Sequence, residues 1–79
     1  YASELFDEIS GRKLIISTDQ PGIQFYTGNH LYGTFNKYQG LCLETQHFPD
    51  SPNNESFPST ILKANEDYYS YTEYKFTTI

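Results

Sequence analysis

Short runs of alternating residues, each closed by glycine, proline or a polar turn, are what most constrains the fold of this chain. Apolar residues hardly recur at the three- and four-residue spacing of an amphipathic helix, whereas alternation at every second residue is typical of strands. The expected strands lie, in chain order, at residues 13–18, 23–27, 41–46, 60–63 and 68–78. We therefore predict an antiparallel all-β fold with about five strands.

The connections between these runs carry turn-forming residues. Ser10-Gly11-Arg12 introduces the first strand, and Asp19-Gln20-Pro21-Gly22 has proline and glycine in the order of a type II turn. Prolines make residues 48–59 a loop, and residues 64–67 predict a hairpin-like turn before the last strand. That last strand, at 68–78, has aromatic residues on both faces, which indicates a strand covered on both sides.

The length and composition bound the size of the fold. A chain of 79 residues holds at most one small domain, and its core is thin. It contains no Met, so we expect a processed product or a piece of a longer protein. Eight Tyr and six Phe favour strands, and such rings also line sugar-binding clefts, where a ring face meets the C–H face of a pyranose.

The charge and the single cysteine exclude several classes of protein. Five basic and ten acidic residues give a net charge of -5, which argues against nucleic-acid binding. No apolar run is long enough for a transmembrane helix. Cys42 has no partner for an internal disulfide, which favours a reducing cytoplasm, and we expect this thiol to be buried and inert.

One expected strand carries a carboxylate where a core residue would be expected. Alternation places Leu41 and Leu43 on one face of residues 41–46, and Cys42 and Glu44 on the other. Glu44 therefore lies close to the end of the strand, where the proline-rich loop begins. The bland interpretation is an edge strand with a solvated polar face. The sharper one is a carboxylate in a cleft that acts as a base or binds a ligand.

Several blocks of the sequence, in order and together, resemble the C-terminal part of the aldose 1-epimerase (galactose mutarotase) family. Two motifs are the most specific: Pro-Gly-x-Gln-x-Tyr-Thr-Gly-Asn, which begins at Pro21, and Leu-Glu-Thr-Gln, which begins at Leu43. The match is carried by residues 10–12, 20–29, 40–53, 57–58, 60–63 and 74–76. The resemblance thus covers nearly the whole chain.

The resemblance implies a large antiparallel β-sandwich, the galactose mutarotase-like supersandwich, with residues 1–79 as a C-terminal fragment of one domain. It also implies an isomerase that interconverts the α and β anomers of free hexoses, such as galactose and glucose, by acid–base ring opening. Glu44, in Leu-Glu-Thr-Gln, would be the general base, and Gln24, in the other motif, would contact the sugar. An acid and a base suffice for this reaction, so no cofactor and no metal are implied.

The family's acid is a histidine from an earlier part of its domain, so we expect the remainder of the domain to supply it. His30 and His47 belong to blocks that do not provide the acid, and we expect His47 to face solvent. Arg12 lies in a turn and does not correspond to the family's sugar-binding arginine. We therefore expect the 79 residues alone to be inactive.

Two alternatives stay open at this point. One is a non-catalytic sugar-binding or regulatory paralogue of the same fold, because one fold hosts several functions. The other is the mutarotase domain of a bifunctional sugar-nucleotide epimerase. The sequence upstream of this chain would decide among these possibilities. An intact acid histidine there favours an enzyme, a replaced one favours a binding protein, and a fused epimerase domain would also lie there.

Overall fold

The computed structural model describes all 79 residues, which form two compact units: Tyr1–Gln20 with Leu62–Ile79, and Pro21–Ile61. The expected all-β class is confirmed, because every regular element except one turn of 3-10 helix is a strand. The structure contains no helical segment that could span a lipid bilayer. The elements are β1 (Ser3–Phe6), β2 (Arg12–Thr18), β3 (Gly22–Tyr26), β4 (Cys42–Gln46), η1 (Ser51–Asn53) and β5 (Thr72–Thr78).

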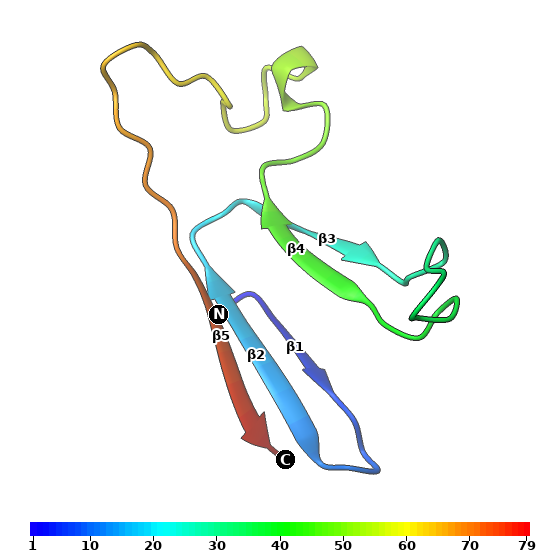
Figure 1. Cartoon of the computed structure of the whole chain (residues 1–79). Coiled ribbons are helices and arrows are strands. Elements are labelled where there is room, and N and C mark those ends of the chain that lie inside the picture. The colour runs from blue at the N-terminus through cyan, green and yellow to red at the C-terminus, as the bar shows by residue number, and fades with distance from the viewer. The chain divides into compact units, whose positions relative to one another are not determined.

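The first unit is an antiparallel sheet with the strand order β1-β2-β5, so β2 lies in its centre (Figure 1). The register places Leu5, Leu14 and Phe76 side by side across the three strands. Ile16 lies on the same face and is fully buried. The opposite face is more polar and carries the ion pair between Lys13 and Glu4, at 3.3 Å. Alternation at every second residue thus gives this sheet one apolar face.

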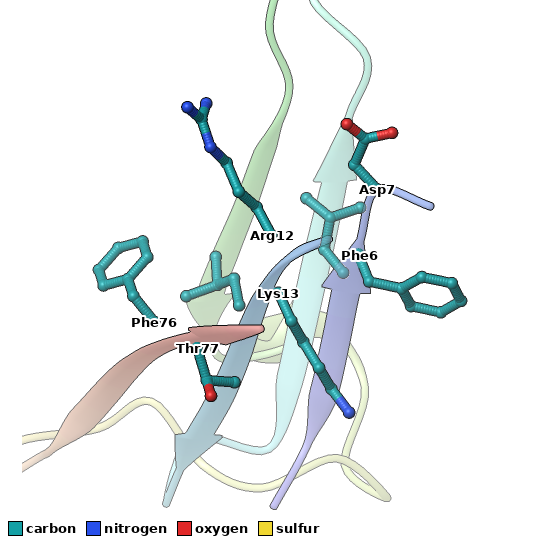
Figure 2. Close-up of a pocket in the computed structure, with 8 residues that line it drawn as sticks. Phe6, Asp7, Arg12, Lys13, Phe76 and Thr77 are labelled. Atoms are coloured by element: carbon teal, nitrogen blue, oxygen red, sulfur yellow. The ribbon is translucent and has the colours of Figure 1, made fainter. Parts of the chain in front are cut away.

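A hollow of about 490 Å³ lies at the end of this sheet near the β1–β2 turn (Figure 2). Its walls include apolar side chains from all three strands, such as those of Leu5, Leu14 and Phe76. Phe76 is 80% exposed and Phe6 is 49% exposed. Every residue of β5 after Thr72 is exposed, so this strand is not covered on both sides within this chain, contrary to expectation. The apolar face of this sheet is thus left open at this end.

The turn between β1 and β2 is built around the Asp7 carboxylate. It accepts hydrogen bonds from the backbone N–H groups of Ile9 and Ser10, at 3.3 and 3.2 Å. Gly11 then adopts a left-handed conformation, with φ 74°, and its N–H donates to the Asp7 carbonyl. The turn expected at residues 10–12 is thus confirmed. Its hydrogen bonds favour the charged carboxylate, since a carboxylate is an acceptor only.

The groups around the Asp7 carboxylate predict a pH dependence. The Ser10 side chain, the backbone N–H groups and the Arg12 charge lower the pKa of the Asp7 carboxyl below its ordinary value of 3.8, and the Ser10 side chain contributes most. Because the folded pKa is depressed, the stabilisation is complete above the unfolded value and is lost as the pH falls through the folded value. We expect a carboxyl NMR titration of Asp7 to show this low midpoint. Ser10→Ala should move the midpoint back toward 3.8, and an unchanged midpoint would contradict this assignment.

The second unit contains the antiparallel pair β3 and β4, which run side by side in Figure 1. The segment between them folds around Gly28, whose carbonyl accepts the N–H groups of Leu31 and Tyr38 at 3.2 and 2.9 Å. Gly28 is buried and has φ 77°, a left-handed conformation that a glycine adopts without penalty. This closed loop joins two strands that lie directly beside each other.

Two expected strands, one strand that was not predicted and one expected turn differ from the structure. Residues 60–63 form no strand, and the last strand begins at Thr72 rather than at residue 68, because only the part from Thr72 onward pairs with β2. Strand β1, in contrast, was not predicted. Gly22 has no positive φ, so Pro21-Gly22 is not a type II turn; Gly22 instead begins β3 and pairs with Gln46.

Candidate functional site

The candidate site is the polar face of the β3–β4 pair. In this pair Gln24 lies directly opposite Glu44. Side chains directly opposite each other in antiparallel strands project from the same face, with Cβ atoms about 4.5–5.5 Å apart. The strand pairing thus brings together the two residues that the sequence predicted as site residues. A ligand lying over this face meets a carboxylate and a carboxamide side by side.

Both side chains are accessible to a ligand and are not engaged by other residues of the chain. Gln24 and Glu44 are exposed, and neither side chain makes a hydrogen bond or ion pair within the chain. The Glu44 carboxylate offers only acceptors, whereas the Gln24 amide offers both a donor and an acceptor. Together they can take a proton from, or hydrogen-bond to, a polyhydroxylated ligand.

The same face extends past this pair toward Tyr26 and Cys42, which lie opposite each other in the register. The His30 ring stacks on the Tyr26 ring, with centroids 6.4 Å apart, and the His30 N–H donates to the Tyr26 hydroxyl at 3.0 Å. Cys42 is exposed, so the expectation of a buried thiol was wrong. The physical reason is that this face of the two-stranded sheet is left open around it.

At its other end the face meets a small hollow of about 80 Å³. Gln24, Gln46 and His47 contribute polar groups to its lining. His47 is half-buried there, whereas we expected a histidine that faces solvent. The Phe48 ring forms part of the same lining, next to Gly22. The open face is therefore flanked by an aromatic ring at either end, Tyr26 and Phe48.

The loop after β4 is held by its own hydrogen bonds. The Asp50 carboxylate accepts a hydrogen bond from the Asn53 amide, and the Asp50 carbonyl accepts one from the Asn54 amide at 2.7 Å. Ser51 is buried and its hydroxyl donates to the Phe48 carbonyl. The Phe48 ring also packs edge-on against Phe57, with centroids 5.1 Å apart. These contacts fix the loop that follows Glu44, rather than leave it free.

Comparison with known proteins assigns this arrangement to a family. A family model described as aldose 1-epimerase matches residues 2–75. The chain belongs to the aldose 1-epimerase family. The resemblance inferred from the sequence motifs is thus confirmed, and the matched residues include both strands of the candidate site.

Individual relatives agree with this assignment. The chain is 49% identical over 76 residues to a protein named galactose mutarotase from Mus musculus, which covers 86% of this chain and 22% of the relative. It is 41% identical over 85 residues to galactose mutarotase from Homo sapiens, and this match covers 98% of this chain and 25% of the human protein. Aldose 1-epimerase from Escherichia coli (strain K12) is 41% identical over 73 residues, and this match covers 81% of this chain and 21% of the bacterial protein. The chain therefore spans only about a quarter of the length of these aldose 1-epimerase relatives.

The residues that line the candidate site of this aldose 1-epimerase family member are not all among those predicted from its sequence. Both include Glu44 and Gln24, whereas Arg12 begins β2 in the first unit and belongs to its turn. Gly22 and Phe48 were missed, because Pro21-Gly22 was interpreted as a turn and Phe48 as a loop residue. Phe48 could have been identified from the sequence, because it is an aromatic residue two positions after the polar Gln46, at the end of the strand that carries Glu44.

Proposed function

We propose that this chain is the C-terminal part of a single aldose 1-epimerase domain, which interconverts the anomers of free hexoses such as galactose and glucose. Glu44 is its general base and Gln24 binds the sugar. The observation that carries the proposal is the direct pairing of Gln24 with Glu44 on an open face, within a chain of this family.

The proposed reaction divides its steps between this chain and the remainder of the domain. Glu44 removes the proton of the C1 hydroxyl while a histidine outside this chain protonates the ring oxygen, so the ring opens. Rotation about the C1–C2 bond presents the other face of the carbonyl, and ring closure reverses both proton transfers. Gln24 holds a sugar hydroxyl next to the base and thereby keeps C1 within reach.

Exposed apolar surface supports the proposal that the chain is part of a larger domain. In the first unit Phe76, Phe6 and Leu5 stay exposed around a hollow, which the remainder of a β-sandwich would cover. By the same proposal these residues alone are inactive, because the acid is absent. A cytoplasmic location and a role in galactose metabolism also stay predictions, the first from the free thiol of Cys42.

Polarimetry tests the proposed activity. The full-length protein that contains these residues should accelerate the mutarotation of freshly dissolved α-galactose in proportion to its concentration. The same preparation should be titrated with galactose by calorimetry. Binding without acceleration would overturn the enzymatic proposal and favour the non-catalytic sugar-binding alternative, whereas acceleration would exclude it. A sugar-nucleotide epimerase assay on the same protein addresses the bifunctional alternative.

Gln24→Ala in the full-length protein should weaken galactose binding. A hydrogen bond to a sugar hydroxyl contributes about 0.5–1.5 kcal/mol, so we expect KM to rise about 2- to 10-fold while kcat changes less. Gln39→Ala is the control, because Gln39 is an exposed glutamine of the same unit that is not on β3 or β4. Equal effects of the two substitutions would remove Gln24 from the sugar site.

A further inference from the structure

We propose that the hollow beside Gln24 is a subsite for one hydroxyl-bearing substituent of the sugar, and that Gly22 keeps it open by leaving room for the Phe48 ring. This inference rests on the proposed function and extends it to residues outside the two expected ones. Gly22 also lines the hollow, and it acts as a positioning residue because the atoms nearest to a side chain there would be those of the Phe48 ring.

The contact between Gly22 and Phe48 is the first step. A Cβ atom on Gly22 would meet Cδ1 and Cε1 of Phe48 at 3.0 Å each, closer than ordinary van der Waals contact. Gly22 lies opposite Gln46, two residues before Gln24, so this Cβ would project from the face that carries Gln24 and Glu44. The ring thus occupies, on the site's own face, the place where a side chain at residue 22 would stand.

The ring cannot retreat freely from such a side chain. The Phe48 ring packs edge-on against Phe57, with ring centroids 5.1 Å apart, and the backbone of Phe48 is tied to Ser51 through the Phe48 carbonyl. Added bulk at residue 22 must therefore displace the ring relative to the hollow that it lines. Tight packing transmits such a displacement to the neighbouring wall.

The chemistry of the hollow fits a polar substituent rather than an apolar one. Its volume of about 80 Å³ holds a few water molecules or one small group. The Gln24 and Gln46 amides can each donate and accept a hydrogen bond, and the His47 ring adds a further nitrogen-bearing edge. Ile23, Phe48 and Pro49 supply apolar walls, which is the mixture that suits a carbon bearing a hydroxyl.

Gly22→Ala in the full-length protein is the main test. Gly22 has no positive φ, so alanine fits the backbone of β3, and the new Cβ should act chiefly through the ring. We expect the Kd and KM for galactose to rise about threefold or more, with kcat within about twofold. Gly40→Ala is the matched control, because its Cβ would meet only the Leu31 side chain, at 3.9 Å, and it should leave both constants unchanged.

A second variant separates displacement of the ring from a loss of folded protein. Phe48→Leu removes the ring that the new methyl group meets, so Gly22→Ala should add less than about twofold in Kd when combined with it. Simple loss of folded protein would lower the apparent kcat and leave KM unchanged, and that result would overturn the proposal. An additive double variant would overturn it as well.

Sugar analogues identify the substituent. Among the monodeoxy analogues of galactose, the one that lacks the group held in the hollow should bind the original protein more weakly and lose nothing further in Gly22→Ala. If every analogue loses affinity equally in Gly22→Ala, the hollow is not a subsite. The two proposals fail separately: unchanged Kd in Gly22→Ala refutes the subsite alone, whereas a shifted Kd without any mutarotation refutes the proposed enzyme alone. If the original full-length protein bound no galactose, both the subsite and the proposed enzyme would be refuted.

Discussion

Glu44→Gln in the full-length protein should slow galactose mutarotation at least about 100-fold, because a positioned general base contributes about 10²- to 10⁴-fold. The substitution keeps the shape of the side chain and replaces a proton acceptor with a neutral amide. Glu44 is exposed and its side chain makes no hydrogen bond or ion pair within the chain, so the change breaks no internal contact. We therefore expect the loss in kcat, with the free energy of unfolding and the galactose Kd little changed.

Glu73→Gln is the matched control for this experiment. Glu73 is also an exposed strand glutamate, but it lies on β5 opposite Ser17 in the first unit. It should retain full activity, measured by polarimetry under the same conditions. A Glu44→Gln protein that keeps more than about a tenth of the activity would remove Glu44 from the role of the base, since a general base typically contributes at least about 10²-fold.

The roles proposed for Gln24 and Glu44 came from the resemblance of their motifs to the aldose 1-epimerase family, whereas strand alternation predicted only the face of its own strand on which each residue lies. Gln24 and Glu44 each lie opposite the larger aliphatic side chains of their own strand, and a two-residue period makes that assignment independent of the exact strand ends. The register between the strands required the structure. A slip by one residue would have placed Glu44 opposite Ile23 or Phe25 and moved it to the other face.

The errors arose where a local pattern disagreed with the strand pairing that the rest of the chain provides. Residues 60–63 contain β-branched and aliphatic residues that favour a strand, yet they pair with no other segment, and an extended segment without a partner forms no ladder. Pro21-Gly22 has the composition of a turn, but Gly22 pairs with Gln46 and lies under Phe48. No window of neighbouring residues contains the Phe48 ring, so sequence pattern alone predicts the turn.

Gly28→Ala should destabilise the full-length protein by about 2–5 kcal/mol, the largest effect on stability that we expect in this chain. Alanine in the left-handed conformation costs about 1–2 kcal/mol, and Gly28 has φ 77°. A Cβ atom would also lie 2.3 Å from the Gly40 carbonyl oxygen and 2.9 Å from Cδ1 of Leu31, and overpacking of this kind costs about 1–3 kcal/mol. Denaturant unfolding of the two proteins measures the difference.

Gly33→Ala separates the two contributions. Gly33 has nearly the same conformation, with φ 73°, but a Cβ there would meet nothing within 4 Å. It should therefore cost only the conformational part, about 1–2 kcal/mol. Equal losses in the two variants would mean that the contact between Gly28 and Gly40 contributes nothing. A larger loss in Gly28→Ala would show that the close packing around Gly28 leaves no room for a side chain in the loop that joins β3 to β4, the strands that hold Gln24 opposite Glu44.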